Sequence, residues 1–297
     1  MARYEPAIDV DALTAIDVHV HIEQGAHGET SLPDDLAAAA AAYFKNGGLQ
    51  PSLDAVAEYY RERSMAAVVF TVDSTTNLGH PPISSAEIAE GAARHNDVLI
   101  PFGSVDPRRG EAAVEQARAL IEDHGVRGFK FHPTVQGFDP SDERYYPLFA
   151  ELERAGVVAL FHTGQTGIGA GMKGGRGLRL ALSNPMLLDG LAADFGDLQI
   201  VMAHPSVPWQ DEALSVATHK HNTWIDLSGW SPKYFPESLV RAAGTYLKDR
   251  VLFGSDYPML SPERWLRDIE QTALKPEALP GILVGNAVRL LGLGGTR

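Results

Sequence analysis

Eight short apolar segments recur along the chain, most of them rich in β-branched or aromatic residues and without polar alternation. Such segments are typical of parallel strands that are buried on both faces. We expect strands at 15–21, 67–72, 98–104, 126–132, 157–162, 199–204, 223–228 and 251–256. Helical patterns separate these strands, as in repeated βα units. Eight such units predict a single-domain (β/α)8 barrel over residues 1–297.

The segments between the strands predict the covering helices and one insertion. We expect helices at Glu111 to His124, Tyr146 to Ala155, Met186 to Phe195 and Glu263 to Leu274. The spacing after the first strand is longer than the others, so residues 23–60 form an insertion, with a helix from about Ser52 to Arg63. A surface helical hairpin and a lid over a site both fit this insertion.

Composition excludes several classes of partner and site. The net charge of -13 and the pI near 5.2 argue against nucleic acid, which requires clustered Lys and Arg. The absence of cysteine excludes disulfides and thiolate sites, so any metal must bind His and carboxylate side chains. The chain begins without an apolar leader and has no run of about 18 apolar residues. We therefore expect a soluble cytoplasmic protein without a membrane partner.

Polar side chains that can bind metal end four of the predicted strands. His19 and His21 end the first strand, and their spacing places both on one face. His162, His204 and Asp256 end three later strands. Because reactive groups of a barrel lie at the carboxyl ends of its strands, these five side chains should converge. Imidazoles and a carboxylate suit zinc, manganese or iron in a site with an open position.

The fourth strand carries two further candidates, Lys130 and His132, which share a face by the two-residue period of a strand. Either side chain could bind an anionic group of a substrate. Lys130 could instead be carboxylated and bridge two metals, or form a structural salt bridge. Asp17 precedes His19 by two residues and is expected on the same face of the strand, where it is either a hydrogen-bond partner of an imidazole or a carboxylate without a catalytic part.

Loops after the later strands supply candidates for binding a substrate. A glycine-rich segment at 167–177 carries Arg176 in an otherwise acidic protein, and it is either a loop that closes on an anionic substrate or an idle flexible loop. It lacks the order of a phosphate-binding P-loop. Trp230 and Tyr257 follow the last two strands and could form the wall of a pocket for an aromatic substrate, although apolar packing would also account for them.

Six segments together resemble the metal-dependent amidohydrolase superfamily, and most closely its branch related to aminocarboxymuconate semialdehyde decarboxylase. They are Ile16–His21, Gly128–Pro133, Leu160–Gly164, Ser183–Pro185, Val201–Pro205 and Leu252–Pro258. The resemblance covers nearly the whole chain. It implies that the metal ligands are His19, His21, His162 and Asp256, and that His204 is a catalytic histidine close to the metal. It also implies a homodimer.

These observations predict a metal-dependent hydrolase. One divalent ion, zinc or else manganese, would activate water against a small anionic ester, lactone, thioester or amide, with Asp256 as general base and His204 orienting the water. The substrate would be carboxylated and aromatic or unsaturated, and would contact Lys130, His132, Arg176, Trp230 and Tyr257. Nonoxidative decarboxylation of a related acid is the alternative, and a catalytically silent metal-binding barrel is the second. The motifs of serine hydrolases and dinucleotide-binding enzymes are missing.

Overall fold

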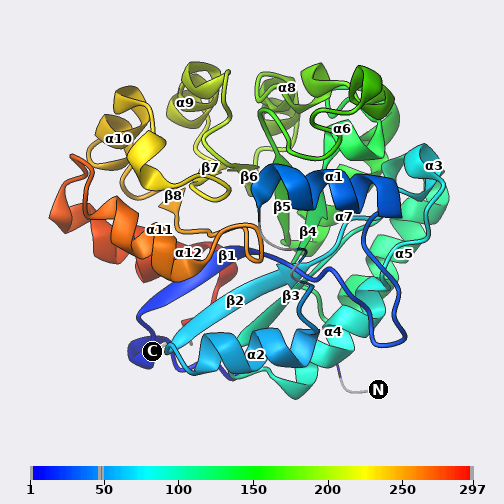
Figure 1. Ribbon diagram of the computed structural model, residues 1–297, viewed down its shortest axis with the longest axis horizontal. Helices are drawn as coiled ribbons and strands as arrows, with labels where there is room; N and C mark the ends of the chain where they lie inside the picture. The colour runs from blue at the N-terminus through cyan, green and yellow to red at the C-terminus, as the bar shows by residue number, and fades with distance from the viewer. Residues whose placement is uncertain (1–2, 46–47, 49, 295–297) are drawn as a thin grey trace.

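Eight parallel strands form one sheet in sequence order from β1 to β8 in the computed structural model, which describes residues 3–45, 48 and 50–294. The strands are β1 Ala15–His21, β2 Met65–Phe70, β3 Leu99–Gly103, β4 Gly128–Phe131, β5 Val158–His162, β6 Ile200–Ala203, β7 Thr223–Asp226 and β8 Val251–Leu252. The Val18 N–H donates to the Phe253 carbonyl, and the His21 N–H donates to that of Tyr257, so the chain after β8 returns to β1. The predicted (β/α)8 barrel is confirmed (Figure 1).

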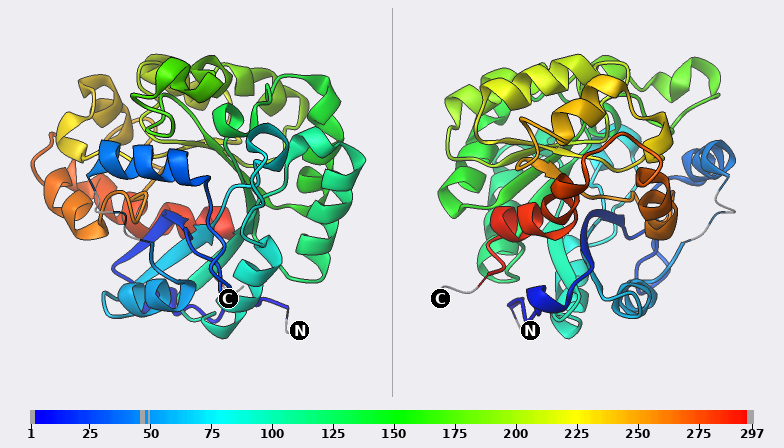
Figure 2. Two further views of the ribbon diagram at one scale, coloured as in Figure 1. Left: turned by 45° about the vertical axis from the view of Figure 1, so that its right-hand side comes forward. Right: turned by 90° about the vertical axis from the view of Figure 1, so that its left-hand side faces the viewer.

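Helices surround the strands, as both views in Figure 2 show. The longer ones are α1 Asp34–Phe44, α2 Leu53–Arg61, α4 Ser85–Arg94, α5 Glu111–Glu122, α7 Tyr146–Ala155, α8 Leu187–Asp194, α9 Gln210–His219, α10 Glu237–Ala243, α11 Pro262–Ile269 and α12 Asn286–Leu291, and two short ones are α3 Thr75–Leu78 and α6 Pro133–Gln136. The predicted helix at 263–274 ends early, at Ile269. None of the described helices is long and apolar enough to cross a membrane.

Alternating side chains divide the apolar core into two layers. One layer fills the barrel and includes Val68, Leu160 and Trp224, and the other lies between strands and helices and includes Phe161 and Trp265. Burying a side chain such as Phe161 completely contributes about 1.5–3 kcal/mol to stability. Because the strands are covered on both faces, a polar side chain within a strand is costly unless it has partners, and most such side chains lie toward the carboxyl ends of the strands.

The insertion after β1 contains two helices with different positions. The helix predicted from Ser52 to Arg63 is α2, which packs on β2 and α4 as one of the covering helices. The other, α1, crosses in front of the barrel in Figure 1. Its residues Tyr43 and Phe44 line the cavity at the carboxyl ends of the strands. The insertion therefore supplies one barrel helix and one helix that borders the candidate site.

Candidate metal and substrate site

A β-bulge in β1 determines which way its polar side chains point. Asp17 pairs with Ala67 and Val20 with Val69, so β1 has one residue more than β2 over this stretch. The Asp17 carboxylate consequently accepts a hydrogen bond from the Tyr60 hydroxyl of α2, outside the barrel, at 2.7 Å. His19 points inward instead. The expectation that Asp17 and His19 share a face is wrong, because the extra residue reverses the alternation.

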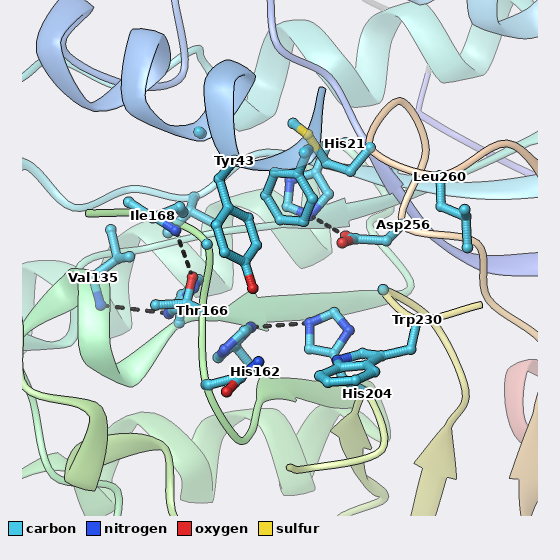
Figure 3. Close-up of a pocket in the computed structure, with 18 of the residues that line it drawn as sticks. His21, Tyr43, Val135, His162, Thr166, Ile168, His204, Trp230, Asp256 and Leu260 are labelled. Carbon is cyan, nitrogen blue, oxygen red and sulfur yellow. Dashed lines mark hydrogen bonds and ion pairs between the residues drawn. The ribbon is translucent and has the colours of Figure 1, made fainter. Parts of the chain in front are cut away.

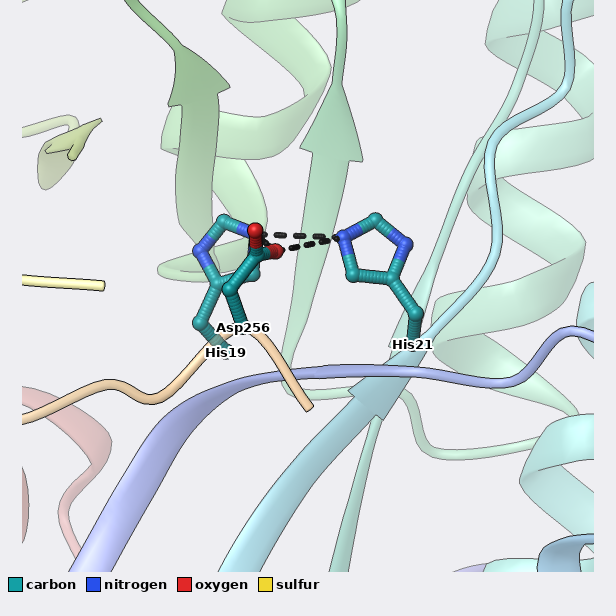
Figure 4. Close-up of side chains that lie close together, drawn as sticks. All are labelled: His19, His21 and Asp256. Atoms are coloured by element: carbon teal, nitrogen blue, oxygen red, sulfur yellow. Dashed lines mark hydrogen bonds and ion pairs between the residues drawn. The ribbon is translucent and has the colours of Figure 1, made fainter. Parts of the chain in front are cut away.

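Three side chains converge as a candidate metal site (Figure 4). The Nε2 atoms of His19 and His21 are 3.3 Å apart, and the Asp256 Oδ1 atom lies 3.3 and 3.1 Å from them. Ligands at the usual distances from a zinc ion are separated by roughly 3–3.5 Å, so the three atoms fit one divalent ion. Asp256 is held with φ +72°, and its N–H donates to the His19 carbonyl at 3.0 Å.

His162 and His204 face the same cavity from β5 and from the end of β6 (Figure 3). The His162 Nδ1 and His204 Nε2 atoms are 3.0 Å apart, and His132 stacks on His162 with ring centroids 3.8 Å apart. The Nε2 atom of His162 is buried without a hydrogen-bond partner among the described residues. His162 does not belong to the compact group of His19, His21 and Asp256, although the resemblance implied it as a fourth ligand.

Lys130 and Asp226 extend this cluster inside the barrel. The Lys130 Nζ atom lies 2.9 Å from His19 Nε2, and the Asp226 Oδ2 atom lies 2.6 Å from His19 Nδ1. Burial lowers the pKa of Lys130 to about 7 and raises that of Asp226 to about 8. Asp226 was not predicted as a site residue. Its one signal was an acidic residue in the otherwise apolar strand at 223–228.

Burial also sets the protonation of the ligand atoms. It lowers the pKa of His19 and His162 well below the ordinary value, and that of His204 to about 4. Burial raises the pKa of Asp256, but the hydrogen bond with His21 and the nearby cationic groups outweigh it and lower that pKa overall. Neutral imidazoles and an ionised carboxylate are the forms that bind a divalent metal, so at neutral pH the donors are ready to coordinate.

A cavity of about 350 Å³ opens above these groups (Figure 3). Its polar floor includes His21, Lys130, His132, His162, His204 and Asp256, and its largely apolar wall includes Leu32, Tyr43, Phe44, Ile168, Trp230 and Leu260. This size and this division are typical of sites for small molecules. The structure therefore places the predicted substrate contacts Lys130, His132 and Trp230 around the cavity.

Two predicted substrate contacts, Arg176 and Tyr257, do not line this cavity. The Arg176 Nε atom lies 2.6 Å from the Asp35 Oδ2 atom of α1, so the guanidinium is engaged by an ion pair. Tyr257 is 7% exposed and stacks on Tyr59 with ring centroids 4.8 Å apart. The safer alternative for Tyr257, apolar packing, is what the structure shows, and Arg176 joins the glycine-rich segment to α1.

A family model described as amidohydrolase matches residues 16–293. The chain belongs to the amidohydrolase family. Curated protein sequences give no match. The match to the family model confirms the resemblance to the amidohydrolase superfamily that the motifs at the strand ends indicated. Members of the family are metal-dependent hydrolases or decarboxylases, so the chain is an enzyme and the alternative of a catalytically silent barrel is set aside.

Solved structures share the fold of this amidohydrolase along almost its whole length. An uncharacterized TIM-barrel protein from Bordetella bronchiseptica has a TM-score of 0.75 and 24% identity, covering 94% of this chain and 98% of that chain. A 2,6-dihydroxybenzoate decarboxylase from Rhizobium has a TM-score of 0.68 and 17% identity, covering 95% and 98%. A dihydroxybenzoic acid decarboxylase from Polaromonas, solved with manganese and 2-nitroresorcinol, has a TM-score of 0.65 and 15% identity, covering 96% and 98%.

Proposed function

We propose that this amidohydrolase is a metal-dependent decarboxylase of a small planar carboxylic acid, aromatic or unsaturated. The observation that carries the proposal is the division of the cavity into a polar floor and a largely apolar wall that includes Phe44, Ile168 and Trp230. A flat amphipathic acid matches this division, with its carboxylate toward the floor and its ring or double bond along the wall. The sequence alone favoured hydrolysis by a small margin, and we place decarboxylation first because an apolar wall keeps water away from the reacting carboxylate.

Decarboxylation breaks the bond between carbon and the carboxylate, releases CO₂ and leaves an electron pair that takes up one proton. A bound divalent ion supplies a Lewis acid that polarises the oxygen atoms of the substrate. Lys130 lines the cavity, and its Nζ atom offers a hydrogen-bond donor for the substrate carboxylate. The proton that replaces the lost group comes from solvent. His204 and Asp256 border the same cavity in their basic forms, so they take it up and pass it to the vacated carbon. The apolar wall excludes the water that would otherwise solvate the reacting carboxylate.

Two properties of the dihydroxybenzoate decarboxylases support this proposal. They share the fold over more than nine-tenths of this chain, and the one from Polaromonas contains manganese. A divalent metal held by His19, His21 and Asp256, with His162 nearby, would correspond to the manganese in the Polaromonas decarboxylase. Zinc and manganese both suit this donor set, and one ion per chain is the expected content.

Hydrolysis is the second candidate, and the state of Asp256 favours it. This carboxylate is held ionised beside His204, as a general base for water must be. A small ester or lactone with a planar acid part would occupy the same cavity. The two reactions differ in which solvent atom enters the product, so isotopes can separate them.

The test is turnover of a panel by zinc- and manganese-loaded enzyme in D₂O and in H₂¹⁸O. The panel contains hydroxybenzoates, unsaturated dicarboxylic acids, and matched esters and lactones. Decarboxylation releases CO₂ and places one deuterium on the vacated carbon, without ¹⁸O in the organic product. Incorporation of ¹⁸O without release of CO₂ would refute the proposal in favour of hydrolysis. Asp256→Asn and His204→Ala enzymes control for contaminating activities, because both should lose turnover.

A further inference from the structure

One buried carboxylate contacts both the metal-site histidine of β1 and a serine that follows β7. The Asp226 Oδ2 atom is 2.6 Å from His19 Nδ1 and accepts a hydrogen bond from the Ser228 hydroxyl at 2.8 Å. The Asp226 Oδ1 atom accepts from the Ser228 N–H at 2.9 Å. Asp226 and Ser228 are both fully buried. Asp226 accepts both hydrogen bonds from Ser228, and a divalent ion at His19 Nε2 would take the lone pair of that atom, so the proton of the His19 imidazole lies on Nδ1, toward Asp226.

The same serine contacts the second histidine. The Ser228 Oγ atom lies 3.0 Å from His204 Nδ1. A hydroxyl has one proton, and that of Ser228 is directed to Asp226, so its oxygen accepts a hydrogen bond from the His204 Nδ1–H. Both imidazoles then carry their proton on Nδ1, and each directs the lone pair of Nε2 away from Asp226. For His19 this lone pair is the one in the candidate metal cluster.

Two glycines leave the space that this arrangement needs. A Cβ atom on Gly229, which has φ +76°, would lie 2.5 Å from His204 Nδ1. A Cβ atom on Gly254 would collide with Asp226 Oδ1 and lie 2.9 Å from the Ser228 Cβ atom. A Cβ atom does not come this close to a non-bonded heavy atom, so residues with side chains could not occupy these positions without displacing the network.

We propose that Asp226 and Ser228 are positioning residues that set the tautomers of two histidines on different strands. Asp226 orients His19 directly for the metal, and it orients His204 through Ser228 for the proton-transfer step. The inference rests on the roles assigned above to His19 and His204, but not on the choice between decarboxylation and hydrolysis. The effects on the two histidines can be separated, because Ser228→Ala removes the serine that links Asp226 to His204 and leaves Asp226 against His19 Nδ1, whereas Asp226→Asn disturbs both. The Ser228 Oγ atom also lies 3.0 Å from His19 Nδ1, but the Asp226 Oδ2 atom is closer to that nitrogen, at 2.6 Å.

The direct test is nitrogen NMR of the zinc-loaded wild-type enzyme labelled with ¹⁵N-histidine, with His204→Gln used to assign the His204 signals. We expect a protonated Nδ1 and an unprotonated Nε2 on His204, and a protonated Nδ1 on His19. A protonated Nε2 on neutral His204 would overturn the proposal. This measurement needs no substrate, so it stands whether or not the proposed reaction is found.

Zinc affinity of the variants, measured by competition with a chelator, tests whether the effect of Asp226 on His19 is separate from its effect on His204. Asp226→Asn should weaken zinc binding about 10–100-fold, as loss of such a partner does in other metal sites. Ser228→Ala should keep the affinity within about threefold, while the His204 signals lose the Nδ1 preference. Equal losses of affinity in the two variants would overturn the proposal. Ser85→Ala is the matched control, since Ser85 is a buried serine that hydrogen-bonds the Ser104 carbonyl away from the imidazoles.

If Asp226→Asn does not fold, as judged by circular dichroism, the wild-type spectrum and the Ser228→Ala variant still decide the question. Separate measurement of kcat and of KM adds a further distinction. The Ser228→Ala enzyme should lose kcat about tenfold with little change in KM, because the variant disturbs a proton-transferring group and leaves the cavity wall intact. A change confined to KM would contradict the positioning role.

Discussion

Replacing Gly229 by alanine should separate the geometry of His204 from the stability of the barrel. Gly229 follows β7 with φ +76°, and an alanine Cβ atom would lie 2.5 Å from His204 Nδ1 and 3.3 Å from Asp256 Oδ2. The left-handed backbone costs an alanine about 1–2 kcal/mol. Restoring an ordinary contact of about 3.5 Å requires His204 to move by roughly 1 Å. Because a displacement of about 1 Å can cost 100-fold in rate, we expect kcat to fall about 100-fold.

Gly156→Ala is the matched control for this variant. Gly156 ends α7 with φ +66° and has no heavy atom within 4 Å of an added Cβ, so it carries the backbone cost without the collision. The backbone cost alone should lower the Tm of each variant by about 2–8 °C, at 2–4 °C per kcal/mol for a chain of this size, and any further loss in Gly229→Ala measures the collision. Calorimetry and kcat on a substrate identified in the isotope panel measure the two effects. A Gly229→Ala enzyme with the kcat of Gly156→Ala would refute the reasoning.

Three further predictions address the metal, the cavity wall and acid stability. Metal analysis of protein purified without a chelator or histidine tag should give about one equivalent per chain, and about two would instead favour a carboxylated Lys130 bridging two ions. Trp230→Ala should raise KM about tenfold at unchanged Tm, since a planar ligand loses an aromatic contact, and an unchanged KM would remove Trp230 from the substrate site. Hydrogen bonds from Arg154 and Arg118 lower the pKa of Glu151 from 4.5 to about 2. Because that pKa is depressed on folding, the stability from Glu151 is present above about pH 4.5 and is lost as the pH falls toward 2. In urea unfolding, the deficit of about 1–2 kcal/mol in Glu151→Gln should therefore shrink between pH 5 and about pH 3, and a constant deficit would contradict the assigned ion pairs.

The sequence predicted the barrel well because its strands are continuous apolar segments bounded by turn residues. The predicted helix Tyr146–Ala155 has the observed bounds, since Gly156 adopts the left-handed conformation that ends it. Strand β8 is shorter than predicted, spanning Val251–Leu252 rather than 251–256. The chain beyond it turns toward the cavity, and Asp256 there has positive φ. Periodicity thus locates the strands, but it does not show where the chain leaves the sheet.

The candidate site was predictable where strand ends define it and not where side chains choose between partners. His21, His204 and Asp256 reach one cavity, and His19 lies against His21 and Asp256, because the carboxyl ends of parallel strands meet there. The sequence cannot show that Arg176 pairs with a carboxylate of the insertion, because the two are brought together only by folding. The partnership of Asp226 with His19 likewise spans 207 residues and joins the two strands that flank β8.

The bulge in β1 gives the two carboxylates beside His19 their different tasks. Asp17, turned outward, accepts hydrogen bonds from the Ser255 N–H at 2.9 Å and the His19 N–H at 3.1 Å, so it fastens the end of β8 to β1. The next residue of that segment is Asp256, whose N–H donates to the His19 carbonyl. A carboxylate outside the barrel therefore fixes the backbone that carries the carboxylate ligand inside it. Without the extra residue, Asp17 and His19 would compete for one face, and either the closure of the barrel or the metal site would lose its anchor.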